Sequence, residues 1–199
     1  MSEIVRMVIV LSMIAGSCSA VLTMADQGLA PRIEKQTDLY VRGPALERLF
    51  GKPAKEVLNN KVLVEVDGVE IPVFYIKNGK KVSTLAIEAI GKGGYGGDLK
   101  LMIGIDLDSG NQTGLEVVSH SETPGLGARI EEVRFRQQWQ GLPIDKKVAL
   151  TANGGVIDAI SGATATSKAA VGGTNEALML LQNYRDAILK SISALEEKS

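Results

Sequence analysis

Cysteine, histidine and aromatic side chains are all scarce in this 199-residue sequence. The single cysteine, Cys18, cannot form an intrachain disulfide, and together with the single histidine, His120, it cannot build a conventional Cys/His metal cluster. No metal site is therefore predicted, and any redox chemistry must come from a bound cofactor. Aromatic residues make up 4% of the chain and the formal net charge is −1. Nucleic acid is not expected as a partner, because stacking side chains and a basic surface are both lacking.

The longest uncharged stretch runs from Met7 to Ala25. As a helix it would span about 28 Å, close to the ~30 Å hydrocarbon core of a bilayer. Residues 1–25 are therefore predicted to form a transmembrane anchor. A cleaved signal peptide is the alternative because small residues such as Ala20 permit cleavage, although Glu3 and the length of the run favour an anchor. The flanking positive charges do not decide the orientation.

Residues 26–35 contain Gly28 and Pro31 and lack apolar periodicity, so a juxtamembrane linker is expected there. One folded domain is expected over residues 36–199, beginning with one or two short helices that end at Gly51.

Short apolar runs separated by turn residues predict a meander of antiparallel strands in the middle of this domain. Asp67-Gly68 and Asn78-Gly79 are typical of tight hairpin turns, and Pro72 predicts an edge or a bulge in the second strand. The expected strands cover residues 62–66, 69–76, 82–90, 99–107 and 114–119. Apolar residues at helical spacing then predict a long carboxyl-terminal helix: Leu178, Leu181, Tyr184, Ile188, Ile192 and Leu195. The predicted fold class is α+β, an antiparallel sheet packed with helices and preceded by one transmembrane helix.

Two loops are candidates for ligand contact. Residues 91–97 contain five glycines, whose backbone can approach a ligand closely, although a structural turn is the alternative. Residues 120–127 precede an expected helix over residues 128–139, so backbone amides and the Thr123 hydroxyl could bind an anion or the edge of a heterocycle. The alternative there is an N-cap at Thr123-Pro124, with His120 on the surface.

The segment Asp158-Ala159-Ile160-Ser161-Gly162-Ala163-Thr164 leads into the expected final helix. Thr166 or Ser167 is the expected N-cap. A phosphate on Thr164 would be compatible with that role, because the helix N-terminus and Lys168 would stabilise its charge.

These motifs resemble the G subunit of the Rnf complex and, more broadly, the FMN-binding domains shared with the C subunit of the sodium-pumping NADH:quinone oxidoreductase. The resemblance rests on the amino-terminal anchor, the glycine loop at residues 93–97 before the strand at 99–106, the block at 120–127 and the segment at 158–167. It implies that residues 36–199 form an FMN-binding domain on the outer, periplasmic side of the cytoplasmic membrane. There it would relay electrons between ferredoxin and NAD with other membrane subunits, coupled to transport of sodium ions or protons.

The resemblance also implies how the flavin is held. A separate flavin transferase would move FMN from FAD onto the hydroxyl of Thr164, leaving a covalent phosphoester. The transferase would recognise Asp158, Ser161, Gly162 and Ala163 with Thr164, and Asp158 would help to place the donor's metal ion. The residues expected near the flavin are Ser161, Gly162, Ala163, Tyr95, His120, Glu122, Thr123, Gly125, Leu126 and Lys168. No catalytic acid–base pair is expected, since the cofactor carries the redox chemistry.

Three alternatives remain at this stage. A hydrolase could pair His120 with Ser161 or Thr164, but the sequence contains no nucleophile elbow. A membrane-anchored binding module without flavin would share the anchor and the fold without needing Thr164. A C subunit of the sodium-pumping oxidoreductase would use the same flavin chemistry in a chain that is usually longer.

Overall fold

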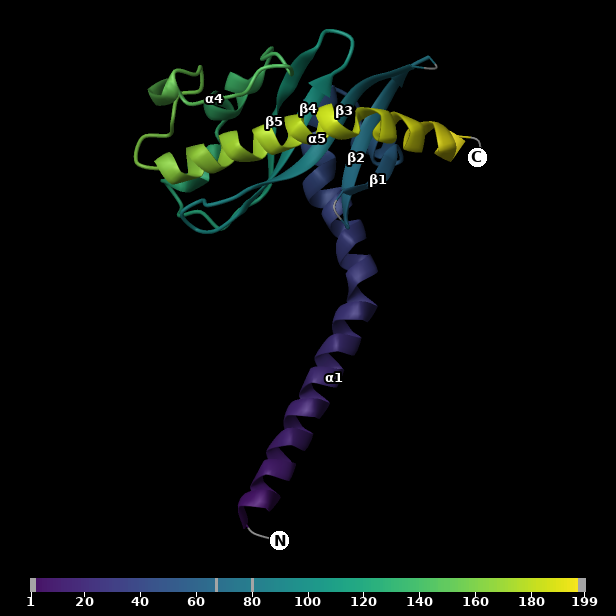
Figure 1. Cartoon of the computed structure of the whole chain (residues 1–199), viewed down its shortest axis with the longest axis vertical. Coiled ribbons are helices and arrows are strands. Elements are labelled where there is room, and N and C mark those ends of the chain that lie inside the picture. The colour runs from purple at the N-terminus through teal and green to yellow at the C-terminus, as the bar shows by residue number, and fades with distance from the viewer. Residues whose placement is uncertain (1–2, 67, 80, 197–199) are drawn as a thin grey trace. The chain divides into compact units, whose positions relative to one another are not determined.

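A computed structural model describes residues 3–66, 68–79 and 81–196 (Figure 1). The chain divides into two units, residues 1–40 and residues 41–199. The helical elements are α1 (Glu3–Thr37), the π-helical turn η1 (Asp38–Arg42), α2 (Gly43–Phe50), α3 (Ala54–Leu58), the 3-10 turn η2 (Gly127–Glu131), α4 (Val133–Arg136), the 3-10 turns η3 (Gln137–Trp139) and η4 (Thr151–Asn153), and α5 (Thr164–Glu196). The strands are β1 (Lys61–Val66), β2 (Val69–Asn78), β3 (Lys81–Gly91), β4 (Leu99–Asp106) and β5 (Asn111–Ser119).

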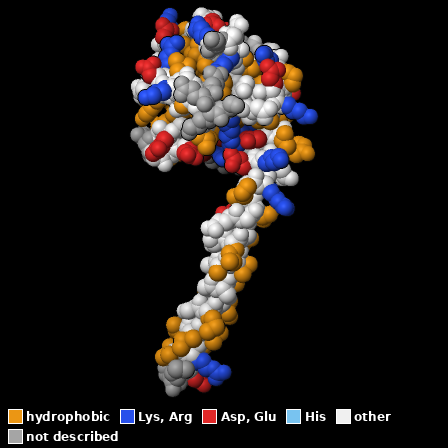
Figure 2. Space-filling view, turned by 90° about the vertical axis from the view of Figure 1, so that its right-hand side faces the viewer, with side chains coloured by type: hydrophobic (Ala, Val, Ile, Leu, Met, Phe, Trp, Pro, Cys, Tyr) orange, Lys and Arg blue, Asp and Glu red, His pale blue; other side chains and the backbone are white. Residues whose placement is uncertain are grey.

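The first unit consists mainly of α1, in which no residue is buried. Hydrophobic side chains lie along its exposed surface (Figure 2). Within the described ranges, the helical segment that begins at Glu3 is the one stretch long and apolar enough to cross a membrane. The predicted linker at residues 26–35 is helical instead, because α1 continues through Gly28 and Pro31 to Thr37. One glycine and one proline cost a helix about 1 and 3 kcal/mol, and helix-forming neighbours on both sides can offset that.

The second unit contains one antiparallel sheet with the strand order β1-β2-β3-β4-β5. This order confirms the predicted meander. Gly68 and Gly79 have φ angles of 81° and 64°, as hairpin turns require, while Asp67 lies outside the described residues. The expectation of an edge or a bulge holds only locally, since β2 is an interior strand and its register shift falls at Ile76/Lys77, away from Pro72. Pro72 is tolerated because it pairs with β1 while the ladder between β2 and β3 begins only at Val73.

Alternating side chains of the central strands serve two separate cores. Val73, Leu85, Ile87, Leu101 and Ile103 pack on the side that α5 covers, and Figure 1 shows α5 crossing the sheet there. The opposite side chains belong to a smaller core with α2 and α3: Phe74, Ile76, Ala86 and Met102 with Ala45, Leu46, Leu49 and Val57. Because both faces are covered, the strands are apolar on both sides. Packing of α5 on the sheet therefore fixes the start of this helix relative to the loops that connect the strands.

The carboxyl-terminal helix is longer than its apolar stripe suggested. It begins at Thr164, and Leu178, Leu181, Ile188 and Ile192 are buried in the core as expected. The side chain of Leu195 lies outside the described residues. Since α5 starts within the candidate attachment segment, the same helix provides both the core and one wall of the site.

The expected helix over residues 128–139 is divided into η2, α4 and η3. Glu132 interrupts it with an extended backbone, at φ −62° and ψ 133°. The break allows Ile130, Phe135 and Trp139 all to reach the core, where the two rings meet edge to face at 5.1 Å. Burial of three large side chains outweighs the preference for one continuous helix.

Candidate functional site

Thr164 is the first residue of α5, and its side chain is exposed. The preceding turn depends on Gly162, whose φ of 80° lies in the left-handed region. Backbone amides at the start of a helix lack intrahelical partners and carry a partial positive charge. The Thr164 hydroxyl therefore stands where a phosphate would be stabilised.

Ser167 holds the segment before Thr164 in place. Its hydroxyl accepts a hydrogen bond from the Ile160 amide at 2.9 Å and donates one to the Ala163 carbonyl at 3.0 Å. Ile160, Ala163 and Ser167 are all buried. The predicted N-cap at Thr166 or Ser167 is therefore wrong, because both residues lie inside α5 and their hydroxyls serve tertiary contacts.

Glu122 is a buried carboxylate, 6% exposed, that joins three segments far apart in the sequence. One oxygen, Oε2, accepts a hydrogen bond from the Thr166 hydroxyl at 2.8 Å. The other, Oε1, accepts one from the Gly96 amide at 3.2 Å. The glycine loop, the block at residues 120–127 and the first turn of α5 are thus tied together through one side chain.

Three glycines leave room for the Glu122 carboxylate and for the backbone beside it. A Cβ at Gly94 would collide with Glu122 Oε1, and a Cβ at Gly127 would collide with Oε2. A Cβ at Gly96 would collide with the Ser121 carbonyl oxygen. Glycine is needed at these positions for close approach, so the glycine loop packs against the next block of the candidate site.

A pocket of about 240 Å³ opens where these segments meet. Its lining comes from the glycine loop, the block after β5 and the start of α5: Tyr95, Glu122, Thr123, Leu126, Gly127 and residues 162–166. Tyr95 is 82% exposed and Leu126 49% exposed, so both offer apolar surface to a ligand. The structure therefore brings Thr164 together with six other predicted residues: Tyr95, Glu122, Thr123, Leu126, Gly162 and Ala163.

The remaining predicted residues lie outside this lining. Lys168 is exposed on α5, and Gly125 forms the turn between Thr123 and Leu126. His120 stabilises the loop at residues 120–127, because its Nδ1 accepts a hydrogen bond from the Glu122 amide at 3.1 Å. Thr123 contributes no side-chain cap to η2, contrary to the N-cap interpretation, and its carbonyl instead accepts bonds from the turn that follows.

The hydrolase alternative loses its catalytic pair in this arrangement. The second imidazole nitrogen of His120, Nε2, lies 3.2 Å from Glu131 Oε1. Both nitrogens of His120 thus face partners other than the hydroxyls of Ser161 and Thr164. A nucleophile needs a base within hydrogen-bond reach, and this histidine does not supply one.

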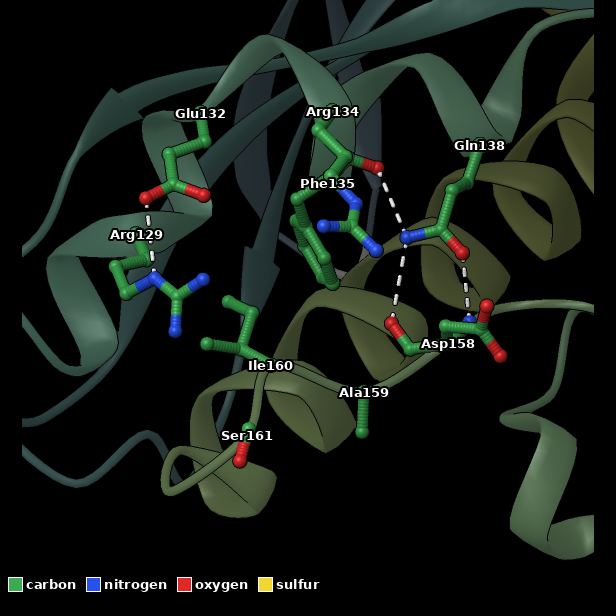
Figure 3. Close-up of a pocket in the computed structure, with 9 residues that line it drawn as sticks. All are labelled: Arg129, Glu132, Arg134, Phe135, Gln138, Asp158, Ala159, Ile160 and Ser161. Atoms are coloured by element: carbon green, nitrogen blue, oxygen red, sulfur yellow. Dashed lines mark hydrogen bonds and ion pairs between the residues drawn. The ribbon is translucent and has the colours of Figure 1, made fainter.

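Ser161 and Asp158 face a second cavity of about 300 Å³ (Figure 3). Its other lining residues come from η2, α4, η3 and the attachment segment: Arg129, Glu132, Arg134, Phe135, Gln138, Ala159 and Ile160. Arg129 Nε pairs with Glu132 Oε1 at 3.0 Å. The segment at residues 158–164 therefore lies between two cavities, with Thr164 lining one and Asp158 lining the other.

Sequence reasoning missed the residues that support the site from a distance. Thr166 was not expected to contact Glu122, and no role was predicted for Gln138, Arg129 or Arg134. A threonine two residues after Thr164 gives no signal of a bond to Glu122, 44 residues earlier. Such partners become visible only when the fold is known.

Comparison with known proteins supports the cofactor class. Residues 94–179 match the FMN-binding domain family. The G subunit of an ion-translocating oxidoreductase complex from Shewanella loihica is 28% identical over 204 residues, covering 94% of this chain and 93% of that protein. The G subunit from Methanosarcina acetivorans is 46% identical over 85 residues, 43% of this chain and 45% of its own length.

The fold is shared with a solved protein. The crystal structure of the C subunit of the Na⁺-translocating NADH-quinone reductase from Parabacteroides distasonis superposes with a TM-score of 0.55 at 24% identity, covering 76% of this chain and 93% of that one. This likeness confirms the α+β class. Over almost its whole length the chain is similar to a G subunit of an ion-translocating oxidoreductase complex, and residues 94–179 carry the match to the FMN-binding domain.

Proposed function

We propose that this chain is the electron-relaying G subunit of an Rnf-type ferredoxin:NAD⁺ oxidoreductase, carrying FMN as a phosphoester on Thr164. One observation supports the attachment most directly: the exposed Thr164 side chain lies at the start of α5 and on the wall of the pocket. The names of the curated relatives support the complex. When bound, FMN supplies the redox chemistry, and the protein supplies its position and surroundings.

The attachment is a substitution at phosphorus. The Thr164 oxygen would form a bond to the FMN phosphorus of FAD as the phosphoanhydride bond breaks, AMP would leave with the bridging oxygen, and the hydroxyl would release its proton. The resulting negative phosphodiester would lie beside the first amides of α5. That position stabilises an anion by about 0.3 to 1 kcal/mol when exposed.

The pocket residues would then hold the flavin. Tyr95 and Leu126 offer exposed apolar surface against which a ring can pack. The exposed Thr123 provides a hydroxyl that can donate or accept at the edge of a heterocycle. Glu122 already accepts from Thr166 and Gly96, so its chief contribution is to keep the pocket walls together.

The first unit supports placement in a membrane complex. Its helix has the length and composition of a membrane span, and none of its residues is buried by the rest of the chain. We infer a single anchor in the cytoplasmic membrane with the flavin domain on its outer side. Other subunits of the complex and the flavin transferase are the inferred partners.

The second candidate is the C subunit of a sodium-pumping NADH:quinone oxidoreductase, because the Parabacteroides protein of that name shares this fold. The G subunit from Shewanella loihica aligns over 94% of this chain, whereas the Parabacteroides C subunit covers 76% of it, which favours the Rnf assignment. Co-purification separates the two candidates. An Rnf-type assembly that retains this chain should oxidise reduced ferredoxin, whereas a sodium-pumping assembly should oxidise NADH with a quinone.

The attachment is tested by expressing the full chain with a flavin transferase and measuring flavin fluorescence of the denatured protein in a gel. Thr164→Ala should lose the covalent signal completely because no oxygen remains to form the ester. The wild-type peptide containing Thr164 should gain the mass of one FMN less one water. Fluorescence that persists in Thr164→Ala would place the flavin elsewhere.

Two controls make the result specific. Thr151→Ala removes another exposed threonine, on η4, and should leave the signal unchanged. Thr164→Ser keeps a hydroxyl at the same position and should retain part of the labelling. A wild-type chain that never becomes labelled would instead favour the binding module without flavin.

A further inference from the structure

Gln138 holds the backbone of Asp158 from both sides. Its Oε1 accepts a hydrogen bond from the Asp158 amide at 2.6 Å, and its Nε2 donates to the Asp158 carbonyl at 3.3 Å. The same Nε2 also donates to the Phe135 carbonyl at 3.3 Å, which fixes the amide plane. Figure 3 shows this carboxamide directed at the Asp158 backbone across one end of the second cavity. The Gln138 side chain thus bonds to both the N–H and the C=O of one residue, as a neighbouring strand does in a sheet.

The far end of the same segment is fixed by Ser167, through Ile160 and Ala163. Ile160 and Ala163 point inward and are buried, whereas Asp158 and Ser161 are exposed. The segment before Thr164 is therefore pinned at both ends. It presents Asp158, Ala159 and Ser161 to solvent, where another protein can contact them.

The hydrogen bonds from Gln138 leave the Asp158 carboxylate available to an external partner. Both bonds from Gln138 to Asp158 use backbone atoms, and no described residue forms a hydrogen bond or an ion pair with the carboxylate. That carboxylate lies at the second cavity, next to the hollow that Thr164 faces. An acidic group held at a fixed distance from the acceptor hydroxyl is suited to meet a cation of an incoming enzyme–FAD complex.

We propose that Gln138 is a positioning residue for flavin transfer: by fixing the Asp158 backbone, it presents the Asp158 carboxylate to the flavin transferase in register with Thr164. This rests on the proposed attachment of FMN to Thr164. Gln138 itself touches neither the cofactor pocket nor the acceptor oxygen. Its effect passes through Asp158.

The expected effect follows from positioning energetics. Misplacing a reacting group by about 1 Å can slow a reaction about a hundredfold. Ser167 still holds the other end when Gln138 is changed, so the loss should be smaller. We expect Gln138→Met, which keeps the length and removes every hydrogen bond, to lower kcat/KM for flavin transfer about tenfold.

The test uses the purified full chain in detergent with FAD, Mg²⁺ and a flavin transferase, and follows initial rates of covalent fluorescence. Gln137→Met is the matched control, because Gln137 is the exposed neighbour and the structure describes no side-chain hydrogen bond for it. It should change the rate less than about twofold. All rates are normalised to folded protein by circular dichroism.

A double-mutant cycle separates positioning from a general effect on folding. In an Asp158→Asn background the carboxylate is already lost, so Gln138→Met should cost less than about twofold further. Gln138→Glu provides a second variant, since it still accepts from the Asp158 amide but cannot donate to the two carbonyls. Its rate should fall between those of wild type and Gln138→Met.

Two results would overturn the proposal. One is a Gln138→Met protein labelled at the wild-type rate, and the other is an equal loss in both Asp158 backgrounds. A wild-type chain and a Gln137→Met chain that both stay unlabelled would instead remove the proposed attachment itself. The failures of the two hypotheses are thus distinguishable in one experiment.

Discussion

The helices α1 and α5 are almost equally long, at 35 and 33 residues, but their surroundings are opposite. No residue of α1 is buried, whereas α5 buries one continuous face against the sheet. Most buried apolar positions of α5 recur at helical spacing, and several are small: Ala169, Ala170, Ala177, Leu178, Leu180, Leu181, Ile188 and Ile192. In α1, apolar side chains occur all around the helix. Composition alone does not distinguish a core helix from a candidate anchor, but the arrangement of apolar residues does.

The helices α1 and α5 have similar local structure, but different surroundings stabilise them. The apolar residues of α5 leave water by packing on β3 and β4, so substitutions there should change the stability of the domain. Those of α1 are exposed, so substitutions there should leave the stability of the domain unchanged and alter membrane association instead. Matched substitutions in the two helices test this difference, with the single tryptophan, Trp139, as a buried fluorescence probe of unfolding.

The largest expected effect concerns membrane retention by α1. The full chain should stay in the pellet after alkaline carbonate extraction. Val10→Arg combined with Ile14→Arg should move it to the supernatant, because each charge at the centre of a span costs about 2.5 to 3.5 kcal/mol. Immunoblots of the two fractions provide the measurement. Wild-type protein in the supernatant would favour a cleaved signal peptide over an anchor.

The second effect is a buried charge in α5. Ala177 is 0% exposed, so Ala177→Arg should destabilise the domain by about 3 kcal/mol or more through overpacking and loss of hydration. The same exchange at the exposed Ala20 of α1 should leave urea unfolding of the domain unchanged. Equal unfolding midpoints for the two variants would contradict the assignment of α5 to the core.

The third effect concerns close approach between α5 and the sheet. A Cβ at Gly173 would lie 2.9 Å from the Gly91 amide nitrogen in β3, whereas a Cβ at Gly16 in α1 would meet nothing within 4 Å. We expect Gly173→Val to lower the free energy of unfolding by about 2 kcal/mol, with no change for Gly16→Val. Thermal denaturation followed by Trp139 fluorescence measures both. The prediction fails if Gly173→Val is as stable as wild type.

The smallest effect isolates one hydrogen bond. Thr23 in α1 and Thr174 in α5 both donate to the carbonyl four residues earlier at 2.9 Å, but Thr174 also accepts a bond from Trp139 Nε1 at 2.8 Å. Thr174→Val should cost about 1 to 2 kcal/mol, because a buried indole N–H loses its partner. Thr23→Val should cost nothing measurable in the domain. A similar loss in both variants would show that the local helix bond, not the indole, matters.

The sheet and α5 could be predicted from the sequence because their signals are local. Alternating apolar residues and turn glycines mark the strands, and the stripe from Leu178 to Ile192 marks the helix. The interruption at Glu132 and the helical course through Pro31 could not be predicted. In the first case burial of Phe135 and Trp139 overrides local preference, and in the second case neighbouring helix formers do.

The candidate site was predicted only in part, since its contacts join distant segments. Resemblance to a family predicted the residues Tyr95, Thr123 and Thr164, which the structure brings to one pocket. Neither composition nor spacing could show that Glu122 bonds to Gly96, 26 residues away, and to Thr166, 44 residues away. Gln138 gave no signal at all, because a glutamine in a short helical turn is ordinary until its partner is known.

The glycines around Glu122 limit which amino-acid substitutions this pocket can accept. Any side chain at Gly94, Gly96 or Gly127 would collide with the carboxylate or with the Ser121 backbone, so these positions have no acceptable substitutes that leave the wall intact. A saturation scan should therefore find them intolerant although Tyr95, Gly97 and Leu126 beside them are exposed. In the proposed flavin site, exchanges that alter the redox properties are therefore expected at Tyr95 and Leu126, the large exposed side chains that line this pocket.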